Sequence, residues 1–165
     1  MASKLYQYLS FKLAIYKLHY VVNHLAPLCR TDCNLNVSTS YNNDTHTITI
    51  GYDFGSDMME EYFRVIDKYW NFNLHKYHFN YDFISLLHEI GHYYTFEMPE
   101  AQEHQHHLEV RAVFALLDRD MVCNEMPRLI DDYYHLPKEA AATTWMIDWI
   151  IAHPRKAAFY NRLMK

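Results

Sequence analysis

The sequence is poor in the residues that break regular structure or crosslink a chain. Of 165 residues, only 3 are Gly, 5 are Pro and 3 are Cys. This composition argues against a long disordered segment or linker. An odd number of cysteines, in a chain that begins without the apolar core of a signal peptide, favours reduced thiols over a disulfide framework. We therefore expect a single cytoplasmic domain over residues 1–165.

Long apolar runs and an excess of positive charge are also missing. No segment approaches the roughly 18 consecutive apolar residues that a membrane span needs. The formal net charge is −5, whereas nucleic-acid binding depends largely on Lys and Arg. Neither a membrane span nor a nucleic-acid partner is therefore expected.

Histidine, in contrast, is frequent, with 12 residues in the chain. His88 and His92 lie four positions apart in an HExxH pattern, and Glu89 follows the first histidine. On a helix, positions i and i+4 share a face, so both imidazoles can bind one ion. Glu89 then points about 100° round the helix, where it can act as a general base on metal-bound water. The pattern is typical of zinc-dependent peptidases.

The residues around this pattern favour a helix over residues 81–95. Phe83, Leu86, Leu87 and Ile90 recur at spacings of three and four, which makes one face apolar and leaves both histidines on another. A bare HExxH pattern can arise by chance in a chain this rich in histidine, with both rings on a solvated or hydrogen-bonded face. A buried helix with a polar stripe is what a metal site needs, so the metal-binding interpretation is preferred.

The remaining periodicity predicts an α+β fold that is mostly helical. Alternating, β-branched residues on both sides of the turn formers Asn42-Asn43-Asp44 predict a β-hairpin over residues 35–52. A strand beside a metal-binding helix can offer its free edge to an extended peptide, and Thr45 to Tyr52 is the predicted edge. Besides the HExxH helix, helices are expected over residues 1–26, 58–70, 99–133 (as inserted helices) and 137–153.

A catalytic zinc site needs a third protein ligand. The sequence after His92 lacks the third histidine of the HExxHxxGxxH pattern, so a downstream glutamate is expected. Glu109 is plausible because it lies within a predicted helix. Glu139 is preferred because three consecutive alanines follow it, and these would let its helix approach another closely. The residues alone leave both open.

The HExxH pattern, followed by a glutamate helix, resembles the ImmA/IrrE-like gluzincin metallopeptidases, and more narrowly their small phage-type or prophage-type members. The glutamate helix of that family has the form E-x-x-A-[N/D]-x-[F/W]-A, and Glu139, Ala142 and Trp145 fall on it. The resemblance implies a minimal zincin-like (gluzincin) domain, with a small β-hairpin or sheet packed on the HExxH helix.

The resemblance also implies the roles of the site residues. Zn²⁺ would be bound by His88, His92 and Glu139, with Glu89 as the general base. Thr143 stands where the family usually carries Asn or Asp. A threonine hydroxyl orients a histidine ligand less strongly than a carboxylate does.

Four side chains beside these motifs are candidates to stabilise the oxyanion of a hydrolytic reaction. Tyr134 and His135 precede the glutamate helix, and Tyr93 and Tyr94 follow the HExxH pattern. The predicted activity is zinc-dependent hydrolysis of peptide bonds in a protein or peptide substrate, which by resemblance is a regulatory protein or host factor. The alternative is a zinc-containing protein-interaction module without proteolytic activity.

Two cysteines raise the question of a second metal site. Cys29 and Cys33 have the spacing C-x-x-x-C, and His24 lies nearby. A four-ligand structural site needs a second pair of ligands, which Cys123 alone does not supply. Free thiols are therefore expected.

Overall fold

Helices predominate in the structure, and a small mixed sheet follows the first helix in the chain. The predicted α+β class, mostly helical, is confirmed. The computed structural model describes residues 2–34, 39–51, 56–95, 97, 100–119 and 126–164. Within them, the elements in chain order are α1 (Ala2–Leu25), β1 (Arg30–Cys33), β2 (Ser40–Asn42), β3 (Thr47–Ile50), α2 (Ser56–Trp70), a 3-10 helix η1 (His75–Tyr77), α3 (Tyr81–Thr95), α4 (Glu100–Arg119), α5 (Met126–Tyr134), α6 (Pro137–Ala152) and α7 (Pro154–Met164).

The predicted hairpin is present as β2 and β3. The two strands are antiparallel, with Ser40 opposite Thr49, and a turn over residues 43–46 connects them. Residues 35–38 and 52 of the predicted hairpin lie outside the described residues. The hairpin therefore forms within the predicted range.

The third strand, β1, is not indicated by the sequence patterns. It runs parallel to β3, with Arg30 opposite Thr47, and gives the strand order β1-β3-β2. The prediction that Thr45 to Tyr52 forms the free edge is wrong, because β3 is paired on both sides. Within the described residues, β2 is an edge strand on the hairpin side of the sheet.

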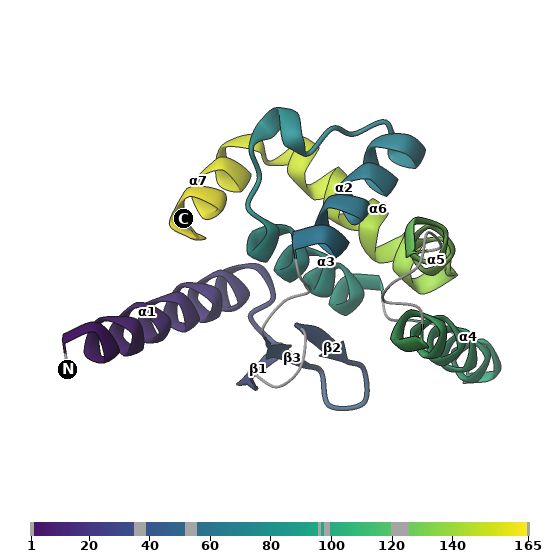
Figure 1. Cartoon of the computed structure of the whole chain (residues 1–165), viewed down its shortest axis with the longest axis horizontal. Helices are drawn as coiled ribbons and strands as arrows, with labels where there is room; N and C mark the ends of the chain where they lie inside the picture. Colours follow the sequence, from purple (N-terminus) through teal and green to yellow (C-terminus); the bar gives the residue numbers. More distant parts are fainter. Residues whose placement is uncertain are drawn as a thin grey trace.

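The HExxH helix lies at the centre of the molecule. Figure 1 shows α3 between the sheet on one side and α6 on the other, with α1 and α4 extending to opposite sides. The bounds of α3 are the predicted ones, and α6 begins at Pro137, whose fixed φ suits a first helical position. The predicted inserted helices are α4 and α5, with residues 99 and 120–125 outside the described part of the chain.

The hydrophobic core surrounds α3. Apolar side chains of α2, α3, α6 and β3 are buried together, among them Ile48, Phe63, Phe83, Leu87 and Met146. The polar side chains of α3, Ser85 and His88, are buried as well. Buried polar groups need hydrogen-bond partners or a metal ion. None of the helices within the described residues is long and apolar enough to cross a membrane.

Candidate metal centre

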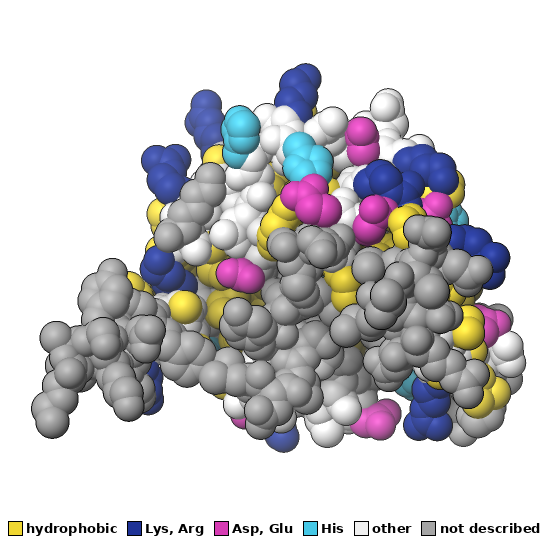
Figure 2. Space-filling view, viewed as in Figure 1, with side chains coloured by type: hydrophobic (Ala, Val, Ile, Leu, Met, Phe, Trp, Pro, Cys, Tyr) yellow, Lys and Arg dark blue, Asp and Glu magenta, His cyan; other side chains and the backbone are white. Residues whose placement is uncertain are grey.

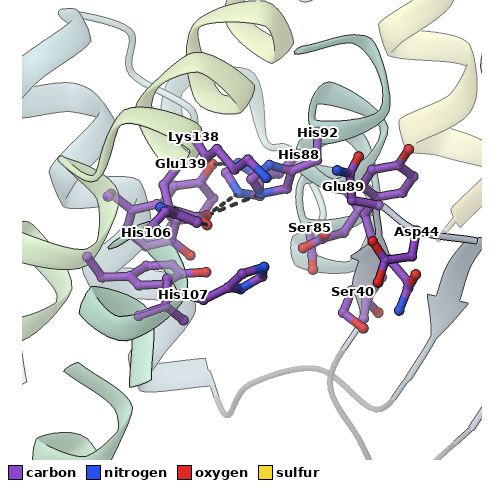
Figure 3. A pocket seen from close by; sticks show the side chains of 18 of the residues that line it. Ser40, Asp44, Ser85, His88, Glu89, His92, His106, His107, Lys138 and Glu139 are labelled. Atoms are coloured by element: carbon purple, nitrogen blue, oxygen red, sulfur yellow. Dashed lines mark hydrogen bonds and ion pairs between the residues drawn. The ribbon is translucent and has the colours of Figure 1, made fainter. Parts of the chain in front are cut away.

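Three predicted metal ligands meet in the interior between α3 and α6. The Nε2 atoms of His88 and His92 lie 3.1 Å and 3.2 Å from Oε2 of Glu139 (Figure 3). One possible ligand atom from each of the three side chains lies within 4.8 Å of the others. His88 and Glu139 are buried and His92 is half-buried. This group can hold a metal ion.

The two N···O distances are close to those of a tetrahedral ligand set. Ligand atoms about 2.0–2.2 Å from a zinc ion at tetrahedral corners are roughly 3.3–3.6 Å apart, slightly more than the 3.1 Å and 3.2 Å found here. Two imidazoles and one carboxylate are also a donor set of catalytic zinc sites that keep a fourth position open. Without an ion, the same distances allow hydrogen bonds from the imidazoles to the carboxylate, so the site stays assembled.

A pair of hydroxyl groups orients His88 from behind. Its Nδ1 lies 3.0 Å from the Tyr62 hydroxyl and 3.3 Å from Oγ1 of Thr143, and the two hydroxyls are 3.2 Å apart. When Nδ1 carries the proton and donates it to this pair, Nε2 keeps a free lone pair toward Glu139. Thr143 and Tyr62 thus orient the His88 ring together. The sequence pattern indicates Thr143 for this role but gives no sign of Tyr62.

The charges of the three groups are strongly coupled. Burial by itself would raise the pKa of Glu139, but the charge of His92 and hydrogen bonds from His106 and His88 hold it well below its usual range. Burial lowers the pKa of His88. Burial opposes the protonation of His92 as well, but the nearby Glu139 carboxylate outweighs it and raises that pKa. Glu139 is therefore ionised, as a metal ligand must be.

A cavity of about 390 Å³ opens beside the three residues. Glu89 is half-buried and lines this cavity together with the ligands. Figure 3 shows Glu89, Ser85 and Asp44 on one wall and Glu139 and His106 on the opposite wall. The remaining lining comes partly from the β2 edge and its turn, namely Thr39, Ser40, Tyr41, Asn42 and Asn43.

The structure separates the four oxyanion candidates. Tyr134 lines the cavity and stacks on Tyr62, with ring centroids 3.9 Å apart. His135 does not line it: its Nδ1 donates to the Asp131 carbonyl oxygen at 2.5 Å, and its ring packs against Tyr69 and Trp70 of α2. The assignment of His135 to the site is therefore not supported by its position.

The two tyrosines after the HExxH pattern also point elsewhere. The Tyr93 ring packs edge-on against Tyr41, at a centroid distance of 6.1 Å. The Tyr94 hydroxyl donates to the Leu25 carbonyl oxygen at 2.5 Å, and its ring stacks on Trp145. Neither side chain lines the cavity.

Two further cavity residues are not predicted by the sequence patterns. Tyr133 lines the cavity beside Tyr134, and a buried histidine of α4, His106, lies against Glu139 with Nε2 3.6 Å from Oε1. His106 belongs to the run His104-Gln105-His106-His107, but no spacing in the sequence connects this run to Glu139. The contact arises only from the packing of α4 beside the site.

The other ligand candidates lie away from this centre. Glu109 accepts a hydrogen bond from Gln105 on its own helix at 2.7 Å and does not line the cavity. Cys29 and Cys33 are free cysteines. Within the described residues, His88, His92 and Glu139 form the one group of His, Cys, Asp or Glu side chains close enough to hold a metal.

The outer surface carries charges of both signs. On the face shown in Figure 2, the Lys and Arg side chains of the described residues are spread around the edge, with Asp and Glu side chains between them. A nucleic-acid interface would gather basic side chains into one patch. The absence of a nucleic-acid partner stays a prediction.

The chain matches no protein-family model, no curated protein and no solved structure.

Proposed function

We propose that this protein is a metallopeptidase that binds Zn²⁺ through His88, His92 and Glu139. The position of Glu89 carries the proposal, because this carboxylate is half-buried on the wall of the cavity that the three ligand residues adjoin. Structural zinc sites are closed by four protein ligands, whereas catalytic sites have three and keep a position open. Three ligands, an open cavity and a nearby carboxylate match the catalytic kind.

The chemistry is divided between the ion and the chain. Zinc, when bound, would act as a Lewis acid that lowers the pKa of a bound water molecule to about 7 and polarises the carbonyl group of the substrate. Glu89 takes a proton from the water that attacks the scissile carbonyl carbon, and then gives this proton to the leaving amine. The hydroxyls of Tyr62 and Thr143 hold His88 in the tautomer whose Nε2 lone pair faces the ion.

One tyrosine of α5 is the proposed neutral donor to the oxyanion. Tyr134 and Tyr133 both line the cavity. Burial and the charge of Glu139 raise the pKa of Tyr133 well above its usual value, and its single hydroxyl proton is already donated to the Glu139 carboxylate. Tyr134 is therefore the proposed donor, and His135 does not line the cavity.

The substrate is an extended peptide that adds to the edge of β2. This strand pairs with β3 on one side, and its residues line the cavity. Backbone hydrogen bonds along an edge strand bind a peptide largely independently of its sequence. By resemblance to the ImmA/IrrE-like gluzincins, the peptide belongs to a regulatory protein in the cytoplasm.

The test compares the zinc-loaded protein with its Glu89→Gln variant. Both are incubated with a mixture of denatured proteins, and newly formed N-termini are identified by mass spectrometry. We expect one bound zinc in each protein, new termini with the wild type, and none with Glu89→Gln or after chelation. Equal cleavage by the variant would overturn the role of Glu89. Zinc binding without any cleavage would favour the protein-interaction module instead.

A further inference from the structure

We propose that His106 is a positioning residue that fixes the Glu139 carboxylate as a metal ligand, which makes α4 a part of the metal centre. This inference rests on the metal site of the proposed function. The two oxygens of Glu139 have different neighbours. Oε2 faces both histidines of the HExxH helix, and Oε1 lies 3.6 Å from Nε2 of His106.

His106 is buried, whereas the adjacent His107 is exposed. Its side chain is 7% exposed, and Nδ1 is buried without a hydrogen-bond partner among the described residues. A neutral imidazole has a single N–H, so a ring that donates from Nε2 to Glu139 leaves Nδ1 as an acceptor. A buried and unpaired acceptor is unfavourable, so no hydrogen bond at Nδ1 explains the burial of the His106 ring. The contact between Nε2 and the Glu139 carboxylate explains it instead.

A donor on the second oxygen matters for metal binding. A carboxylate ligand can rotate about its terminal bond, and a hydrogen bond to the oxygen that does not face the ion fixes one orientation. The Glu139 side chain is 5% exposed, so water has little access to supply that hydrogen bond. Tyr133 also donates a hydrogen bond to the same carboxylate. His106 comes from a helix that lies between the two ligand helices in the chain.

The adjacent histidine provides a matched control. His107 is exposed and lines the cavity, and Figure 3 shows it extending toward the open part of the cavity rather than to Glu139. His106→Phe and His107→Phe thus make the same substitution on the same helix, and only the first removes the imidazole that faces Oε1 of Glu139. His106→Gln keeps an N–H donor on a flexible side chain.

The experiment measures zinc affinity by competition with a chromophoric chelator, and the visible absorption of the Co²⁺-substituted proteins. We expect zinc to bind His106→Phe about 10- to 100-fold more weakly than the wild type. His107→Phe should bind like the wild type, and His106→Gln should recover part of the loss. The Co²⁺ spectrum should change in His106→Phe only, because it reports the coordination geometry. Circular dichroism of the metal-free proteins checks folding, and His106→Ala replaces a Phe variant that does not fold.

The outcomes separate this inference from the proposed function. A wild type that binds no zinc would overturn the metal centre as a whole. Wild-type binding that His106→Phe retains in full, with an unchanged Co²⁺ spectrum, would overturn only the role of His106. An equal loss of affinity in His107→Phe would also overturn it, because the effect would then belong to the helix and not to the donor.

Discussion

The backbone carbonyl oxygen of Ala142 lies 2.5 Å from the position that a Cβ atom on Gly91 would occupy. Real Cβ atoms do not approach backbone oxygens so closely, so α3 and α6 can touch here only because residue 91 has no side chain. Gly91 directly precedes the ligand His92 on α3, and Ala142 follows the ligand Glu139 by three positions on α6. The spacing of the two helices, and with it the geometry of the ligand set, depends on this glycine.

Replacing this glycine should destabilise the protein. In a helix interior, Gly→Ala by itself stabilises by roughly 1 kcal/mol because alanine has the higher helix propensity. At Gly91 the added methyl group meets the backbone of α6, and overpacking of this kind costs about 1–3 kcal/mol. We expect Gly91→Ala to lower the free energy of urea unfolding and to weaken zinc binding. The sign of the change in the free energy of unfolding is the test. A Gly91→Ala variant more stable than the wild type would contradict the close contact between the helices.

The choice between the two glutamates can be tested by metal content. Glu139 lies with the histidines, whereas Glu109 is paired with Gln105 on the side of its own helix. We expect one zinc per chain in the wild type and in Glu109→Ala, and loss of the zinc in Glu139→Ala. Plasma mass spectrometry of the dialysed proteins measures this. Retention of zinc by Glu139→Ala would show that the third ligand lies elsewhere.

The features that the sequence predicts well are those that local periodicity determines. The range of α3 follows from apolar residues three and four positions apart, and the pairing of His88 with His92 follows from helix geometry. Pro137 and the alanines after Glu139 likewise indicate a helix that can pack closely. These patterns need no knowledge of the rest of the chain.

The features that were missed depend on contacts between distant segments. β1 pairs in parallel with β3, and its four residues, Arg-Thr-Asp-Cys, are too polar and too few to show the apolar alternation of a strand. His106 reaches Glu139 only because α4 packs beside the site. His135 lies outside the cavity because α5 ends at Tyr134 and the His135 ring bonds back to the Asp131 carbonyl oxygen. A difference of one position along the chain thus decides which side chain enters the cavity.

The two hydroxyls behind His88 should matter jointly for metal affinity. Tyr62 and Thr143 are both fully buried and both lie within hydrogen-bond distance of Nδ1. Either can accept the Nδ1 proton alone, so Tyr62→Phe or Thr143→Val should weaken zinc binding only slightly. The double variant leaves a buried N–H without a partner and should weaken it about 10- to 100-fold. A chelator competition series measures all four proteins, and additive small effects would contradict a shared role.

A charged cluster around Asp131 provides the pH dependence that the structure predicts. Asp131 accepts hydrogen bonds from Arg64 at 2.6 Å and from Lys68 and Tyr69 at 3.0 Å, and so joins α5 to α2. Burial by itself would raise the pKa of Asp131, but the hydrogen bonds from Lys68 and Arg64 outweigh it and lower this pKa. The pKa of Asp131 is thus lower in the folded protein than in the unfolded chain, where it is about 3.9. The cluster therefore stabilises the folded state at pH values above about 3.9. This stabilisation is lost as the pH falls through the folded-state pKa.

Asp131→Asn should therefore reduce the free energy of unfolding by about 1 kcal/mol between pH 5 and pH 7. The difference from the wild type should shrink below about pH 4, where the wild-type carboxylate itself takes up a proton. Urea unfolding at a series of pH values measures it. Asp132→Asn is the control on the same helix, since Asp132 is exposed and lies 3.8 Å from Arg128. A difference that does not change with pH would show that Asp131 acts through packing instead. Because α5 carries Tyr134 onto Tyr62, loss of the cluster should also loosen the wall of the metal centre.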